Sequence, residues 1–336
     1  MPSRILICRP NARLGNTLLL TPLVQEIETI LPGAEVDILT ACPAADEVFR
    51  EFSCVRTVYQ LRRYGVRHPW HQVATMLRAS RTRYDLILDP CPKSWSSGLA
   101  TRLLRGRLKL GFRSPEKTRD TCHCVPIEQA PPHMAAYPVY LFRQGVRGRA
   151  SDASGAPVPR LSIALTVRER NFGRRKLRQM TQAPDSTLIL AVATRATGAK
   201  AFPLPWWREM LKLVGAELPH VRVIEILSAT EPAQLPEYPA YLSTRLRRLA
   251  GVINAADCFV SADSGLMHLG AATATATIGL FKVTEPSTYA PYGGLNRALL
   301  VDDRALARVS GDIVRVLQEA RGTQSLADRL APHFAR

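Results

Sequence analysis

Short apolar runs alternate with amphipathic segments along the chain, and this alternation limits the possible folds more than any other feature. In the first half, the apolar runs have the length and composition of buried strands. We expect strands at residues 5–8, 36–39, 57–61, 86–89 and 108–111, and helices at 17–30, 44–52, 70–80 and 94–104. Strands that alternate with helices form a parallel sheet with helices on its faces, so the sequence predicts a doubly wound α/β domain.

The same alternation restarts after residues 147–160, a segment rich in Gly, Ser, Pro and Ala that we interpret as a linker. Beyond it we expect strands at 187–193, 222–226, 258–260, 277–281 and 298–301, and helices at 167–180, 205–216, 244–255 and 305–319. A chain of 336 residues is too long for one typical core. We therefore predict two Rossmann-like domains, residues 1–155 and 156–336, with a cleft between them and a last helix that could pack back on the first domain.

The net charge is strongly positive, because 45 Lys and Arg residues outnumber 28 Asp and Glu and give +17. Both halves are basic. Such a field favours an anionic partner, which could be a phosphorylated substrate, an anionic membrane surface or a nucleic acid. The alternative is a surface that is simply solvated by arginine. The sequence contains no nucleic-acid-binding motif and no interleaved aromatic platform, so we expect no nucleic-acid partner.

Seven cysteines, mostly in apolar runs, are typical of reduced thiols in the cytosol. Cys122-His123-Cys124 hints at a metal, but a structural site needs a second pair at a suitable spacing, and we expect no metal. There is no run of about 18 apolar residues that could span a membrane, and no signal peptide at the start. We therefore expect a cytoplasmic protein that touches a membrane surface at most.

The stretch SADSGLMHLGAA, residues 261–272, has the order strand, polar turn, helix. In open parallel sheets, ligands bind at such strand ends, where the following helix offers unpaired N–H groups. Asp263 and Ser264 could cap the helix, and Gly265 lets a phosphate approach the backbone. An ordinary capped turn without a ligand is the alternative interpretation.

Two further turns of the second half could face the same ligand. The loop TRATGAK, residues 194–200, lacks the order of a P-loop, yet its hydroxyls, glycine and lysine suit a diphosphate. Lys200 would supply a point charge, unless it is only a solvated surface lysine. Thr284-Glu285 forms the third turn.

Three segments together resemble a known family. They are RLGNTLLLTPLVQEI near the start, KAFPLPWWREML in the middle and FVSADSGLMHLGAATATATIGLFKVTEPSTYAPYG near the end. They resemble the ADP-heptose lipopolysaccharide heptosyltransferases, glycosyltransferase family 9, over about residues 4–294. The resemblance implies a GT-B fold and a metal-independent, inverting transfer of heptose from ADP-heptose, used as a substrate with no cofactor. The implied acceptor is the acidic lipopolysaccharide core at the inner membrane, where the protein would be peripheral.

The resemblance also implies roles for single residues. Lys200 and Thr197 would contact the diphosphate of the donor, and the other donor-binding residues would be Thr194, Asp263, Ser264, Gly265 and His268. His268 could equally be a packed helix histidine. The donor's adenine would lie near residues 226–229 and 246–253. Acceptor-binding residues would be Arg13, Gly15, Arg62 and Arg63, within a basic surface that includes Arg67, Arg102, Arg105 and Arg107.

The sequence departs from the family pattern at one catalytic position. Where many members have an aspartate that looks like the base, this chain has Asn16, and an amide accepts no proton at neutral pH. Asn16 can then only orient the acceptor. Asp89 is our candidate base, unless stabilisation of the leaving group dominates, and Lys200 is the third catalytic residue. Lys282 and Val283 also replace a usual Gly-Pro. A family 9 enzyme with another donor or acceptor, and a catalytically silent relative, remain open alternatives.

Overall fold

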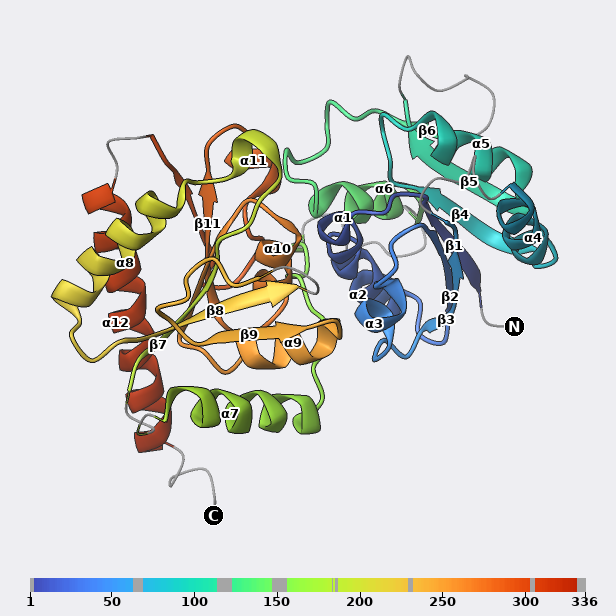
Figure 1. Cartoon of the computed structure of the whole chain (residues 1–336). Helices are drawn as coiled ribbons and strands as arrows, with labels where there is room; N and C mark the ends of the chain where they lie inside the picture. Colours follow the sequence, from blue (N-terminus) through green and yellow to red (C-terminus); the bar gives the residue numbers. More distant parts are fainter. Residues whose placement is uncertain are drawn as a thin grey trace. The chain divides into compact units, whose positions relative to one another are not determined.

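The computed structural model describes residues 3–62, 69–113, 123–146, 156–182, 184, 187–228, 232–302 and 306–330. The chain divides into two compact units, Met1–Ser162 and Ile163–Arg336, each built on one parallel sheet (Figure 1). The domain boundary that we expected after residue 155 lies outside the described residues. The α/β class and the two parallel sheets are confirmed.

The sheet of unit 1 has the strand order β3-β2-β1-β4-β5-β6, and every pair is parallel. Its strands are β1 (Arg4–Arg9), β2 (Glu35–Thr40), β3 (Val55–Gln60), β4 (Tyr84–Asp89), β5 (Gly106–Phe112) and β6 (His123–Val125). The order reverses between β1 and β4. At such a switch point the loops diverge to opposite faces of the sheet, and a ligand can bind at the carboxyl ends of the two strands.

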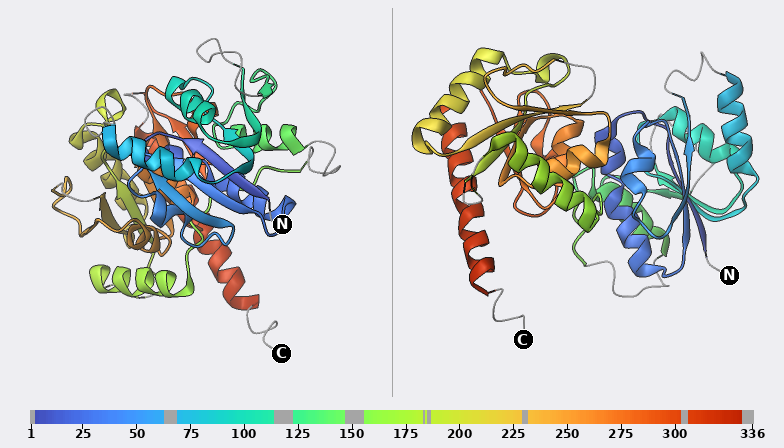
Figure 2. Two further views of the ribbon diagram at one scale, coloured as in Figure 1. Left: turned by 90° about the vertical axis from the view of Figure 1, so that its right-hand side faces the viewer. Right: turned by 60° about the horizontal axis from the view of Figure 1, so that its bottom comes forward.

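The helices of unit 1 are α1 (Leu14–Leu18), α2 (Thr21–Ile30), α3 (Ala45–Phe49), α4 (Pro69–Ser80), α5 (Trp95–Leu103) and α6 (Ala136–Val146). Side chains of α4 and α5 form one core cluster with Leu6 and Cys8 of β1, so these two helices cover the same face of the sheet (Figure 2). α2 packs against α6.

One helix that we expected at residues 17–30 is two helices, α1 and α2. Pro22 explains the break, because it has no N–H to donate and its ring excludes the carbonyl of Leu18 from a helical hydrogen bond. The hydroxyl of Thr21 donates to that Leu18 carbonyl at 2.8 Å instead. The turn residue Asn16 therefore lies on a separate helix of five residues.

The sheet of unit 2 has the order β12-β11-β10-β7-β8-β9, again all parallel. Its strands are β7 (Ile189–Ala193), β8 (Arg222–Ser228), β9 (Ala240–Ser243), β10 (Cys258–Ala262), β11 (Ala276–Phe281) and β12 (Arg297–Leu300). The helical segments are α7 (Val167–Thr181), the 3-10 turn η2 (Gly198–Lys200), α8 (Leu204–Glu217), α9 (Leu246–Ile253), α10 (Gly265–Ala271), α11 (Pro286–Tyr289) and α12 (Leu306–Leu330).

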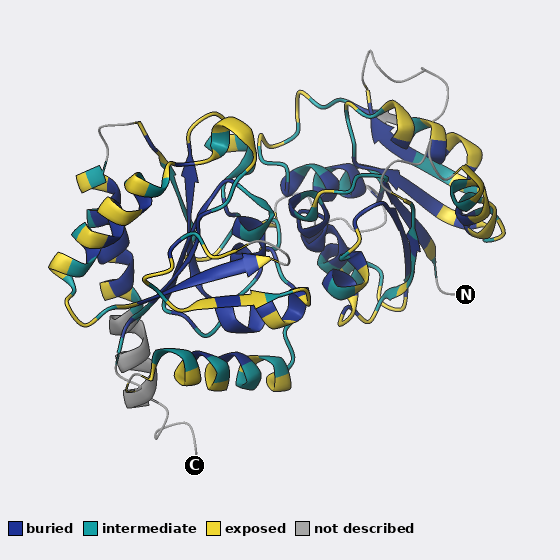
Figure 3. Cartoon of the chain, viewed as in Figure 1, coloured by how far each residue is buried: buried dark blue, intermediate teal, exposed yellow. Residues whose placement is uncertain are grey.

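The core of unit 2 is filled from one side by α8 and α12, which pack against each other and bury Trp207, Met210 and Leu317 against the sheet. Dark strands under partly exposed helices show the same layering in Figure 3. None of the described helices is both long enough and apolar enough to cross a membrane.

Helices α7 and α9 pack against each other in direct backbone contact. A Cβ added at Gly173 of α7 would overlap the carbonyl of Gly251 in α9, and one added at Gly251 would meet the carbonyl of Glu169 at 2.7 Å. The same contact is fixed by an ion pair, because Arg247 donates from Nε to Glu169 Oε1 at 2.5 Å and from Nη2 to Oε2 at 2.8 Å. Glu169 also accepts the N–H of Thr166 in a capping box that begins α7.

Candidate functional site

In unit 2, three turns gather at one edge of the sheet because the strands before them are neighbours. β10 lies between β7 and β11, so their carboxyl ends are adjacent. The turn after β7 carries Lys200, the turn after β10 carries Asp263, and the turn after β11 carries Thr284. Strand order therefore brings together residues that lie far apart in the sequence.

Asp263 joins these three turns. Its Oδ2 accepts a hydrogen bond from Lys200 Nζ at 2.5 Å and another from the hydroxyl of Thr284. The carboxylate is only 7% exposed, whereas the Lys200 side chain is 32% exposed. Asp263 thus holds the lysine in place. Within the described residues the ammonium makes no second hydrogen bond, so its two other N–H groups can bind a second anion. This arrangement suits a phosphate.

The turn after β10 confirms one of the two expected helix caps. Ser264 is the N-cap of α10, and its hydroxyl accepts the N–H of Met267 at 3.4 Å. Asp263 does not cap the helix, because Lys200 and Thr284 engage its carboxylate instead. Gly265 opens α10, and His268 is buried within it at 4% exposure.

Thr194 and Thr197 differ although both belong to the loop after β7. Thr197 is exposed at the N-cap of η2, next to Gly198 with φ of 60°. Thr194 is buried, and its hydroxyl donates to Glu225 of β8 at 2.8 Å. Thr194 therefore fastens the end of β7 to the neighbouring strand β8.

Glu225 is a buried residue that our sequence interpretation missed. Its Oε2 accepts the backbone N–H groups of Gln234 at 2.9 Å and Leu235 at 3.1 Å, while Oε1 takes the Thr194 hydroxyl. The carboxylate thereby ties the segment after β8 to the start of the Lys200 loop. The signal in the sequence was a glutamate inside the apolar run 223–227. A carboxylate in such a run is expected to be buried, and a buried carboxylate needs several hydrogen-bond donors.

In unit 1, the expected acceptor turn follows β1. Arg13 is exposed at the N-cap of α1, and its N–H donates to Asn11 Oδ1 at 2.8 Å. Gly15 is buried and Asn16 is half-buried on the same helix. Asp89 ends the adjacent strand β4 and is fully buried, with Oδ1 accepting the hydroxyl of Ser97 and the N–H of Cys91 at 3.1 Å.

Arg9 is a second residue that the sequence interpretation missed. It ends β1 at the switch point and is only 4% exposed. Its Nε and Nη1 are buried without a hydrogen-bond partner anywhere in the described parts of the chain. Two buried guanidinium N–H groups without an acceptor are costly, and an anion that binds beside them would compensate that cost. The signal in the sequence was an arginine directly after the apolar run 5–8.

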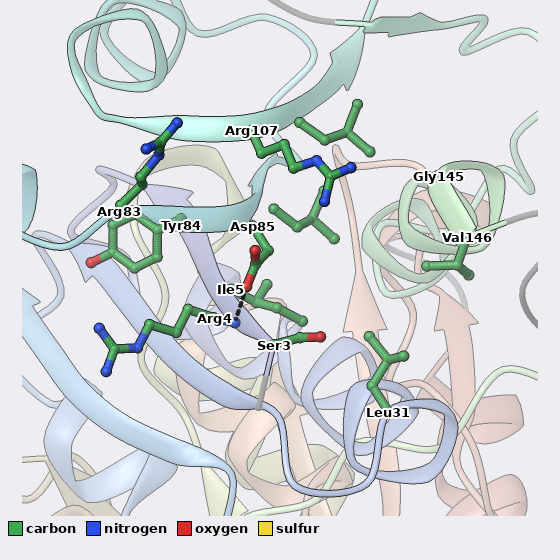
Figure 4. A pocket seen from close by; sticks show the side chains of 12 residues that line it. Ser3, Arg4, Ile5, Leu31, Arg83, Tyr84, Asp85, Arg107, Gly145 and Val146 are labelled. Atoms are coloured by element: carbon green, nitrogen blue, oxygen red, sulfur yellow. Dashed lines mark hydrogen bonds between the residues drawn. The ribbon is translucent and has the colours of Figure 1, made fainter. Parts of the chain in front are cut away.

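The other arginines of the expected basic surface do not all lie at the turn after β1. Arg62 is exposed, and its carbonyl accepts Gln72 Nε2 at 2.8 Å, while Arg63 and Arg67 lie outside the described residues. Arg107 lines a cavity of about 920 Å³ with Arg4 and Arg83 (Figure 4). That cavity lies at the amino ends of the strands, so it is separate from the Asn16 turn at their carboxyl ends.

No group of three or more His, Cys, Asp or Glu residues in the described ranges could hold a metal ion. Cys122, part of the cluster that hinted at a metal, lies outside them. His123 and Cys124 belong to the edge strand β6, which pairs with β5.

A model of one protein family, described as glycosyltransferase family 9 (heptosyltransferase), matches residues 70–312. The fold is similar to that of Escherichia coli heptosyltransferase WaaC with ADP, at 19% identity and a TM-score of 0.69, covering 94% of this chain and 99% of that one.

Two further solved structures are similar. The E. coli ADP-heptose lps heptosyltransferase II has 16% identity and a TM-score of 0.72, with 94% of this chain and 99% of that one covered. A glycosyl transferase family 9 protein from Veillonella parvula has 13% identity and a TM-score of 0.73, with 95% and 97% covered. No curated protein sequence matches the chain. At these identities the structural likenesses establish the fold.

Proposed function

The chain belongs to glycosyltransferase family 9, and we propose that it transfers a heptose from ADP-heptose to an acidic acceptor of the lipopolysaccharide inner core. The observation that carries the proposal is the cluster of Lys200, Asp263 and Thr284 at three adjacent strand ends. The choice of donor is supported by the similar WaaC, whose structures contain ADP and ADP-2-deoxy-2-fluoro heptose.

In the proposed reaction, an acceptor hydroxyl attacks the anomeric carbon from the side opposite the diphosphate. The new C–O bond forms while the bond to the β-phosphate oxygen breaks, and the electron pair leaves with ADP. The configuration of the sugar carbon is thereby inverted. The enzyme must stabilise negative charge on the diphosphate and provide a place for the hydroxyl proton.

Lys200 would meet the first requirement. Its ammonium is held in place by Asp263 before the donor arrives, so it needs no reorganisation when charge develops on the leaving diphosphate. Thr197 and the backbone near Gly265 would donate to the same phosphates, and Ser264 and His268 would lie at the donor as well. With this fixed cation we propose that the transfer needs neither a metal nor a cofactor.

Asn16 cannot accept the hydroxyl proton, so the second requirement needs another group. Asn16 would orient the acceptor hydroxyl, and Asp89 remains our candidate base, although it is fully buried and already accepts two hydrogen bonds. In the acceptor itself, a carboxylate or phosphate would pair with the buried guanidinium of Arg9. Arg13, Gly15, Arg62 and Arg63 would be the other acceptor-binding residues. Because such an acceptor is lipid-linked, we also propose that the protein is cytoplasmic and peripheral at the inner membrane.

Two alternative functions are considered. Asn16 favours the first, a silent relative that binds ADP-heptose without transferring it. The second is a family 9 transferase with a different donor or acceptor. Calorimetric titration with ADP, UDP and GDP, without metal and then with magnesium, tests the donor class. Selective binding of ADP without metal is the expected result, and binding of UDP or GDP instead would overturn the donor assignment.

Transfer to a Kdo-containing lipid A acceptor then separates the enzyme from the silent relative. The expected result is formation of the heptosylated lipid, detected by mass spectrometry, together with stoichiometric ADP. ADP binding without any product over a range of acceptors would favour the silent relative.

A further inference from the structure

Helices α4 and α5 carry their large apolar side chains on the outside. In α4 these are Trp70, Val73 and Leu77, and in α5 they are Trp95, Leu99 and Leu103. We call these six residues the α4/α5 face. Trp70 is 82% exposed and Trp95 is 66% exposed.

The spacing shows that each set forms a stripe. Residues 70, 73 and 77, and residues 95, 99 and 103, recur every three or four positions, so each set lies on one side of its helix. The sides that face the sheet consist mainly of small residues, with Thr75 and Ala79 buried in α4 and Ser97, Ala100 and Thr101 buried in α5, and Met76 is the large apolar side chain of α4 that packs against the core. An ordinary surface helix has the opposite arrangement, with its large apolar side chains toward the core.

The two stripes form one surface. α4 and α5 pack on the same face of the unit 1 sheet within one core cluster, and both of their outer sides are largely exposed in Figure 3. Large exposed apolar side chains gathered on one face of a unit are typical of a surface that binds a partner or a membrane.

The charged residues around the α4/α5 face indicate which kind of partner it binds. The sequences of α4 and α5 contain no Asp or Glu, and exposed basic residues stand at or beside the helices, namely Arg78, Arg81, Lys93, Arg102 and Arg105. A second copy of this chain would bring the same positive charges together, which is unfavourable. An anionic lipid surface offers both an apolar layer and negative headgroups.

We propose that the α4/α5 face rests on an anionic lipid bilayer. Trp70 and Trp95 lie at the interface between headgroups and acyl chains, where tryptophan is enriched in membrane proteins, and the arginines contact the headgroups. Both tryptophans lie at the amino-terminal ends of their helices, which is the sheet edge where β4 ends at Asp89. The two tryptophans therefore lie toward the same sheet edge as the proposed acceptor turn of unit 1.

The inference extends the proposed function, because it rests on an acceptor embedded in lipid, but its test needs neither donor nor acceptor. The full chain is floated with vesicles of phosphatidylcholine, with or without phosphatidylglycerol. Wild type should float with the anionic vesicles and much less with the neutral ones. Trp70→Ser with Trp95→Ser should lower the partition coefficient about 10-fold per tryptophan.

Two matched controls isolate the face. Val167→Ser removes an exposed apolar side chain from α7 in unit 2 and should change nothing. Arg102→Gln with Arg105→Gln should weaken anionic binding about 5-fold per arginine, whereas Arg168→Gln with Arg175→Gln on α7 should have little effect. Quenching of tryptophan fluorescence by brominated lipid should also disappear in the variant that lacks Trp70 and Trp95.

Three results would overturn the inference. One is equal vesicle binding by wild type and the double tryptophan variant. Another is an equal loss of binding in the α7 controls. The third is a wild-type dimer in light scattering that the tryptophan variant abolishes while no species binds vesicles, because the face would then bind a second copy. None of these results would affect the proposed transfer reaction, which is measured separately with donor and acceptor.

Discussion

Lys200 and Asp263 form an ion pair with Nζ 2.5 Å from Oδ2, between the turns that follow two neighbouring strands. The pair has two separable effects. It neutralises a carboxylate that is almost fully buried, and it holds an ammonium at the surface of the turn. Substitutions can remove one effect without the other.

Lys200→Ala should weaken ADP binding by about 10- to 100-fold, the value of a hydrogen bond to a charged group. It should also lower the free energy of unfolding, because Asp263 loses its counter-ion. Adding Asp263→Asn should recover the stability but not the affinity. Calorimetry and thermal unfolding measure the two effects. Lys212→Ala, which removes an exposed lysine of α8, is the matched control. Recovery of affinity in the double variant would argue against a phosphate contact.

Asn16→Asp should increase kcat by about 10-fold or more, because a carboxylate in this position can accept the acceptor's proton. The gain should be lost below about pH 4, where an ordinary aspartate is protonated. ADP affinity should not change. Asn11→Asp is the control, since Asn11 Oδ1 accepts the N–H of Arg13 and a carboxylate keeps that bond. A lower kcat in Asn16→Asp would mean that the amide itself is needed, and Asp89→Asn would then test the other base.

Arg9→Met should change stability and function in opposite directions. Replacing a buried guanidinium whose Nε and Nη1 have no acceptor in the described residues with an apolar side chain should raise the unfolding temperature. The KM for the acceptor should rise by about 10- to 100-fold, because a charge-assisted hydrogen bond to its anion is lost, while ADP affinity stays the same. Arg9→Lys should keep part of the acceptor affinity. A large loss of stability in Arg9→Met would mean that Arg9 is structural and would contradict the anion-binding role.

The ion pair of Glu169 with Arg247 should contribute stability that depends on pH. Burial alone would raise the pKa of Glu169, but hydrogen bonds from Arg247 and Thr166 outweigh it and lower the pKa from 4.5 to about 2. Because the pKa is lower in the folded state, the stabilisation is fully present above pH 4.5 and is lost as the pH falls toward 2.

The difference in unfolding free energy between wild type and Glu169→Gln should therefore shrink steadily over that pH range. Urea unfolding at a series of pH values measures it. Glu237→Gln breaks an exposed pair with Arg208 and should have little effect at any pH. A difference for Glu169→Gln that does not vary with pH would show that the contact acts through packing rather than charge.

The alternation of apolar runs and amphipathic segments was sufficient to predict both sheets, because a buried parallel strand has a strong local signal. The strands β6 and β9 were missed. β9 is a four-residue edge strand that forms only by pairing with β8, and no local pattern encodes that pairing. The helix break at Pro22 was also missed, although the proline itself was the signal.

For the site residues too, local features could be predicted from the sequence, whereas contacts that depend on the tertiary structure could not. That Lys200 and Asp263 follow strands could be read from the sequence, but their contact depends on the order β11-β10-β7, which is a tertiary property. Arg9 and Glu225 both stand at or within apolar runs. The sequence shows such charges but does not show whether the fold pairs them. Here Glu225 accepts three hydrogen bonds, whereas Nε and Nη1 of Arg9 have no acceptor in the described parts of the chain.

The contact between Gly173 and Gly251 couples the evolution of two distant positions. Neither residue can acquire a side chain while α7 and α9 keep their spacing, because each added Cβ would collide with the backbone of the other helix. A substitution at either position requires the helices to move apart, and that movement would stretch the bonds between Arg247 and Glu169. The two glycines and this ion pair should therefore be inherited together, as one unit, in descendants that keep this helix packing.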